Sequence, residues 1–197
     1  MLRKTFCNRQ TLLLGVILGC LWGCSGKQIE SPDAKGGILD LSQWRFSENE
    51  TVTLKGQWIL LWNELASPRS IETLKEKHSD TIQVPSLWTT QKHPQESGRN
   101  LSGQGHATYV LEIKLPAGIR SQDLTLATQA VGTAANWVIT TPDGTQELGR
   151  MNQGVASSSS IGTIPVRVNA AVNLGASRQR SVVVWLHLSN YHVARGG

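Results

Sequence analysis

The feature that most limits the fold of this chain is a series of short apolar segments that alternate with a period of two residues. In residues 106–115, one face would carry Ala107, Tyr109, Leu111, Ile113 and Leu115, and the other Thr108, Glu112 and Lys114. Residues 181–188 alternate in the same way, but both of their faces are apolar. A period of two is typical of β-strands. The pattern therefore predicts a half-buried strand at 106–115 and a strand at 181–188.

Further strands are predicted between clear turn signals. They cover residues 51–54, 57–62, 81–84, 124–130, 137–141, 145–148 and 164–172. Segment 57–62 is apolar on both faces, as expected for a central strand of a sandwich. Pro142, Asp143 and Gly144 supply a hairpin turn, and residues 154–162 form a serine-rich loop. The one helical candidate is residues 63–77, which Ser67 and Pro68 interrupt.

This pattern predicts about eight to ten strands at the spacing of an all-β, antiparallel β-sandwich. A jelly roll is the expected topology. No predicted helix is long enough for a βαβ unit, so a nucleotide-binding fold of that kind is not expected.

The first residues have the character of an export leader. Residues 1–10 are basic and residues 11–22 are apolar, and that run is too short for a confident membrane span. The leader ends in Leu21, Trp22, Gly23 and Cys24, which resembles a bacterial lipobox with Cys24 as the lipidated residue. Cys20 is a second candidate, and an uncleaved signal anchor is the alternative. We therefore expect a signal peptide at 1–23, a flexible tether at 24–37 and a β-sandwich at 38–197.

Charge and cysteine content exclude two classes of function. The formal net charge of +5 falls to +2 without the leader residues Arg3, Lys4 and Arg9. No basic stripe suited to a phosphate backbone remains, so nucleic acid is not an expected partner. All three cysteines lie at or before Cys24, so the sandwich has neither a disulfide nor a thiolate metal site.

Several segments occur in an order typical of one known family. They are LDLSQW at 39–44, LKGQW at 54–58, VPSLW at 84–88, GHATY at 105–109, and SNYH at 189–192 before Gly196 and Gly197. Together they resemble the periplasmic N-terminal domain of bacterial seven-transmembrane receptors with diverse intracellular signalling modules. The resemblance implies a jelly roll of the galactose-binding-domain type. In that family, the domain precedes seven membrane helices and a cyclase, kinase or diguanylate cyclase module.

Tryptophan provides the candidate ligand contacts. A sugar can stack its apolar face on an indole while polar neighbours bind its hydroxyls. We expect Trp58, Trp62 and Trp185 to pack in the core because they lie within strands. Trp88 precedes a polar loop at 89–105, and Trp137 lies beside Asn136 before the hairpin, so these three residues are the predicted ligand-binding set.

No catalytic or metal-binding pattern is visible. The five histidines lack zinc-ligand spacing, and the acids are scattered near turns. The chain has no Gly-x-Ser-x-Gly, no P-loop and no Gly-x-Gly-x-x-Gly motif. We expect no cofactor and no chemistry in this chain.

These observations predict an extracytoplasmic ligand-sensing domain, held at the bacterial cell envelope and binding a carbohydrate or similar small molecule. Binding would shift the position of the segment after Gly197. One alternative is the sugar-binding sandwich at the front of an exported glycoside hydrolase, which the 54–58 and 84–88 motifs also resemble. The other is a stand-alone binding or scaffold lipoprotein.

The three interpretations differ in the sequence expected after Gly197, because we expect this chain to be the N-terminal part of a longer protein. The receptor predicts seven apolar stretches of about 20 residues each, then a signalling module. Sequencing the coding DNA for several hundred codons tests this expectation. A catalytic barrel would favour the glycosidase, and an immediate stop codon would favour the stand-alone lipoprotein.

Overall fold

The structure is a computed structural model that describes residues 31–47 and 50–196. The predicted leader and Cys24 lie outside the described residues. The described part contains β1 (Ile38–Asp40), β2 (Gly56–Trp62), α1 (Ile71–Lys77), β3 (Thr81–Val84), β4 (Gly105–Lys114), β5 (Thr125–Thr128), β6 (Ala134–Thr140), β7 (Glu147–Val155), β8 (Ile164–Pro165), β9 (Ala170–Asn173) and β10 (Ser181–Asn190). Two 3₁₀ turns lie at Trp88–Thr90 and Ser121–Asp123.

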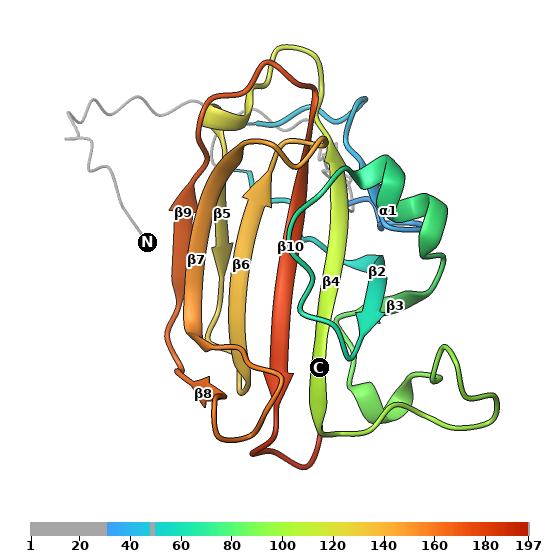
Figure 1. Cartoon of the computed structure of the whole chain (residues 1–197). Helices are drawn as coiled ribbons and strands as arrows, with labels where there is room; N and C mark the ends of the chain where they lie inside the picture. The colour runs from blue at the N-terminus through green and yellow to red at the C-terminus, as the bar shows by residue number, and fades with distance from the viewer. Residues whose placement is uncertain (1–30, 48–49, 197) are drawn as a thin grey trace, which may run out of the picture. The chain divides into compact units, whose positions relative to one another are not determined.

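One large sheet organises the domain, with strand order β3-β2-β4-β10-β6-β7-β8 (Figure 1). All of these neighbours pair antiparallel. Strand β1 is also part of this sheet and adds a short parallel pairing to the far half of β4, beyond the segment that β2 covers. Strands β5 and β9 form a second, two-stranded sheet. The domain is therefore an all-β, largely antiparallel sandwich, as the sequence predicts, while the jelly-roll topology stays a prediction.

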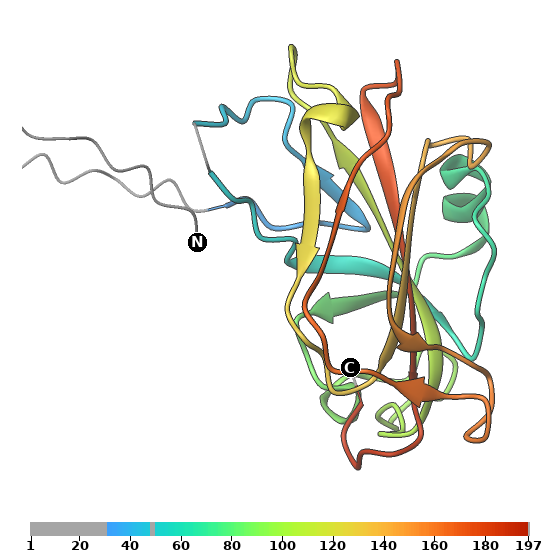
Figure 2. The same ribbon diagram turned by 90° about the vertical axis from the view of Figure 1, so that its left-hand side faces the viewer.

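The larger core lies between the two sheets. It contains the residues at every second position of β4 and β10, from Ala107 to Ile113 and from Val182 to Leu188, together with Trp58 and Leu60 of β2. Leu126 of β5 and Val172 of β9 pack against this core from the second sheet. Figure 2 shows β5 and β9 on one side of the large sheet and α1 on the other.

A second core lies on the opposite face of the large sheet. Ile59, Val110, Val183 and Trp185 point to this face, and Ile71 and Leu74 of α1 cover them, together with Ala66. Helix α1 has only seven residues, too few to be stable alone in water. Its place therefore depends on these apolar contacts.

This second core corrects one expectation and confirms another. Strand β4 is not half-buried, because Thr108 and Val110 are fully buried and Glu112 is nearly so. Strand β2 is a central strand with two apolar faces, as predicted.

The described boundaries differ from the predicted ones in two further places. Residues 51–54 form no strand, although Val52 and Leu54 still pack against the larger core. The predicted strand at 164–172 is divided into β8 and β9. No helix among the described residues is long and apolar enough to cross a membrane.

Polar groups on the α1 side are satisfied by the segment that covers them. Lys75 of α1 forms an ion pair with Glu112 at 2.5 Å. The Thr108 hydroxyl donates to the carbonyl of Glu64 at 2.8 Å and accepts the backbone N–H of Ala66 at 2.9 Å. Buried polar groups are costly without partners, so these bonds set the path of residues 63–77 over the sheet.

His187 gives this side of the sheet a pH dependence. Its Nε2 lies 2.8 Å from the carbonyl oxygen of Ala66 and donates to it. Burial lowers the pKa of His187, and the hydrogen bond to Ala66 opposes this effect without cancelling it. The unfolded chain therefore binds the His187 proton more tightly than the folded chain does.

We predict that the free energy of unfolding falls as the pH is lowered through 6.5 toward the depressed pKa of His187, because protonation then favours the unfolded state. Urea denaturation between about pH 7.5 and pH 5 measures the slope. His187→Gln removes the titrating group and should flatten the slope in this interval. An unchanged slope in the variant would show that other groups cause the dependence.

Candidate ligand-binding cleft

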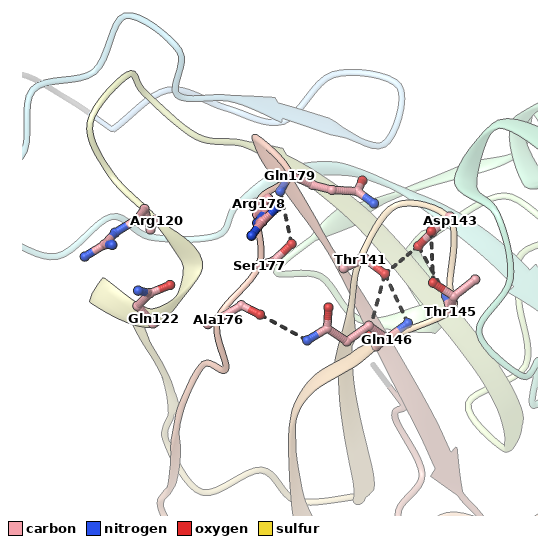
Figure 3. Close-up of a pocket in the computed structure, with 10 residues that line it drawn as sticks. All are labelled: Arg120, Gln122, Thr141, Asp143, Thr145, Gln146, Ala176, Ser177, Arg178 and Gln179. Carbon is pink, nitrogen blue, oxygen red and sulfur yellow. Dashed lines mark hydrogen bonds between the residues drawn. The ribbon is translucent and has the colours of Figure 1, made fainter.

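A shallow cleft of about 570 Å³ lies at the end of the sandwich where three loops meet. Its walls come from Arg120 and Gln122, from residues 141–146 of the β6–β7 hairpin, and from residues 176–179 before β10 (Figure 3). Its volume is in the range of small-molecule sites. The cleft lies at the start of β10, so ten strand residues separate it from the other end of the domain.

Asp143 and Gly144 determine the conformation of the hairpin that forms one wall of the cleft. The Asp143 carboxylate accepts hydrogen bonds from the Thr141 hydroxyl at 2.5 Å and from the Thr145 hydroxyl at 2.9 Å. These bonds hold the pKa of Asp143 below its usual value. Gly144 has φ +73°, and a Cβ there would lie 2.6 Å from the backbone of Arg69. The turn therefore needs both the acidic residue and the glycine.

Hydrogen bonds connect the three walls. Gln146 Nε2 donates to the carbonyl of Ala176 at 3.0 Å, and Gly175 N donates to the carbonyl of Leu148 at 2.6 Å. The Ser121 hydroxyl donates to the carbonyl of Gly175 at 2.6 Å. Because each loop is bonded to its neighbour, the cleft is formed before any ligand arrives.

The cleft is polar and carries cations. Arg120 Nε lies 3.6 Å from Asp123 Oδ2, and the two side chains are 66% and 39% exposed. Arg178 has no hydrogen bond or ion pair with any described residue. Among the described residues, no aromatic ring lines the cleft. Such a surface binds by hydrogen bonds and charge, not by stacking.

The structure places the predicted residue Trp88 in the core, with an exposed fraction of 0%. Its Nε1 donates to the Tyr109 hydroxyl, and its ring meets Trp62 edge-on with 4.9 Å between ring centroids. Burial raises the pKa of the Tyr109 hydroxyl. Trp88 therefore has no ring face available for a ligand.

The end of the chain covers Trp88. Trp88 N donates to the carbonyl of Gly196 at 2.6 Å, and a Cβ at Gly196 would collide with the indole. Asn190 Nδ2 donates to the carbonyls of Gly103 at 2.5 Å and Val193 at 2.7 Å. We call residues 190–196 the C-terminal clasp. The loop at 89–105 is thus held at the opposite end of β10 from the cleft.

Trp137 and Asn136 project to opposite faces of β6. Trp137 is half-buried against the larger core, and its Nε1 donates to Gln153 Oε1 at 3.2 Å. The Asn136 amide donates to Asn152 Oδ1 and to the carbonyl of Gly154, and accepts the N–H of Ala156. The structure therefore does not bring Trp88, Trp137 and Asn136 together in one site, and none of them lines the cleft.

Four of the histidines form separate hydrogen bonds in different parts of the domain. His93, His106, His187 and His192 each bond a backbone group or Tyr191. Within residues 31–47 and 50–196, no group of three or more His, Cys, Asp or Glu side chains is placed to hold a metal ion.

The sequence reasoning missed Arg120 and Arg178. Both lie in loops, where a lone arginine resembles any solvated cation. One sequence signal could have indicated these two arginines. Arg120 lies near Gln122 and Arg178 beside Gln179, in turns before and after predicted strands.

Comparison with protein-family models finds no match for this chain. Comparison with curated protein sequences finds no match either. The resemblance to the seven-transmembrane receptors therefore depends on the short segments named above.

We predict that Trp88→Ala destabilises the domain by about 3–5 kcal/mol, because it leaves a cavity under the clasp and removes the partner of Tyr109. Denaturant unfolding at neutral pH measures the loss. Trp137→Ala should cost less, because that ring is only partly buried. A Trp88 variant as stable as the parent would contradict the core role of this indole.

Proposed function

We propose that this chain is the extracytoplasmic ligand-binding domain of a bacterial signalling receptor, and that it binds a carbohydrate or a similar small polar molecule in the cleft. The observation that carries the proposal is the cleft itself, which three mutually bonded loops form at one end of the sandwich. The export leader supports a place at the outer side of the cytoplasmic membrane. The absence of a recognisable catalytic motif in the sequence favours binding over chemistry.

The position of β10 supports a sensing role. Residues 176–179 line the cleft and lead directly into β10, and β10 ends at the C-terminal clasp. A ligand bound to residues 176–179 would therefore contact the loop that leads into β10, whose other end is joined to the clasp. The clasp would be closed when Trp88 N is bonded to Gly196 and open when that bond is broken. A ligand shifts the balance between these two states only if it binds them with different affinity.

Blocking the cleft tests the binding proposal. Ala176→Trp places an indole in the cleft, and Ser160→Trp is the matched control in an exposed loop at the other end of β7. Isothermal titration of the full chain with a panel of mono- and disaccharides measures binding. We expect at least tenfold weaker binding for Ala176→Trp and parental binding for Ser160→Trp. Equal binding in both variants would contradict the cleft as the site.

Hydrogen exchange distinguishes a sensor from a passive binding module. The N–H of Trp88 is bonded to the carbonyl of Gly196, so its exchange rate reports on the closed clasp. A sensor predicts that a bound saccharide changes this rate. Binding without any change at Trp88 would contradict the sensing role and favour a simple sugar-binding module.

A further inference from the structure

We infer that the cleft selects an anionic, hydroxyl-rich ligand, such as a sugar that carries a carboxylate or a phosphate group. The inference rests on the proposed function, because it names the ligand class of the same cleft. It goes beyond a neutral saccharide, which the tryptophans alone would suggest. Three observations carry it: the charge balance at this end of the sandwich, the lack of a stacking surface, and the donors and acceptors in the walls.

The cations at this end outnumber the acids that remain free to neutralise them. Arg120 and Arg178 line the cleft, and Lys114 and Arg180 line a neighbouring groove of about 390 Å³. Neither Arg178 nor Arg180 has a side-chain hydrogen bond or ion pair with a described residue. A ligand anion in the cleft would find the unpaired guanidinium of Arg178, with Arg180 in the neighbouring groove. The planar fork of a guanidinium suits carboxylate and phosphate oxygens.

Two acids at the same end are in ion pairs, and two accept hydrogen bonds from neutral groups. Asp143 is bonded within the hairpin, Glu112 is paired with Lys75, and Asp123 lies beside Arg120. Asp40 accepts the N–H of Ser42 at 2.9 Å. The two ion pairs neutralise Glu112 and Asp123, while Asp143 and Asp40 keep their negative charge. The unpaired cations Arg178, Arg180 and Lys114 therefore exceed the unpaired carboxylates by one.

A neutral sugar has little to hold it in this cleft. The part of the chain that the structure describes contributes no aromatic ring to the walls, so it offers a neutral saccharide no stacking surface there. Exposed hydrogen bonds contribute little net affinity in water, because the ligand exchanges them for bonds to water. Bonds to a charged group are stronger, so an anionic substituent supplies the affinity that stacking does not.

The remaining wall groups suit the hydroxyls of such a ligand. Gln122 and Gln179 offer amide donors and acceptors, and both are exposed. The Thr145 hydroxyl donates to Asp143, so it offers only its oxygen as an acceptor at the rim. Gln146 is already used as the link to Ala176. The cleft therefore places a neutral amide beside each arginine, while the hairpin wall carries the Asp143 carboxylate and the Thr145 hydroxyl.

Calorimetric titration of the full chain with glucuronate, glucose 6-phosphate and glucose tests the inference. We expect at least one of the two acids to bind at least tenfold more tightly than glucose, with an affinity that falls as salt is raised. Arg178→Gln should weaken acid binding by about tenfold or more. Arg167→Gln is the matched control, because Arg167 is an exposed cation that does not line the cleft. The two acids distinguish a carboxylate from a phosphate as the recognised group.

The outcomes separate this inference from the proposed function. Equal binding of acids and glucose that is insensitive to Arg178→Gln would overturn the anionic selectivity but leave a saccharide-binding cleft. Equal weakening by Arg178→Gln and Arg167→Gln would show general charge attraction and would also overturn it. No binding of any of the three probes, at either low or high ionic strength, would count against both proposals.

Discussion

The structure depends on the antiparallel pairing of β10 between β4 and β6. β10 pairs with β4 along its whole length and with β6 from Val183 to Ser189. Its alternate residues enter the two cores on opposite faces of the large sheet. A shift of its register by one residue would exchange the two faces, so the hydrophobic burial on both sides holds one register. The cleft and the C-terminal clasp take their positions from the two ends of this strand.

The strands with regular alternation could be predicted from the sequence because their apolar residues are set by burial. Segments 57–62, 81–84 and 181–188 lie within or at the described strands β2, β3 and β10. The second face of β4 was misjudged because Thr108 and Glu112 have the character of solvent-facing residues. Both are buried, since residues 63–77 supply their partners from far along the chain. Such partners cannot be seen in a local pattern.

The candidate site was harder to predict for a different reason. Trp88 lies shortly after a proline and precedes a polar loop, which suggests an exposed ring, yet the C-terminal clasp covers it. A contact between residue 88 and residue 196 has no local signal. The cleft was missed because its walls are three loops whose bonds run mainly to backbone carbonyls. Almost any residue can supply a carbonyl, so the sequence does not mark such bonds.

The central position of β10 has a mechanical consequence. A pull on residue 196 would first load the clasp, where Asn190 and the N–H of Trp88 hold residues 193 and 196. Beyond the clasp, tension would run along the axis of β10, parallel to a strand bonded on both sides. Its hydrogen bonds would then bear the load together in shear, not one after another as in a peeled edge strand. A force along β10 would thus meet the few hydrogen bonds of the clasp first and the paired strands of the sheet second.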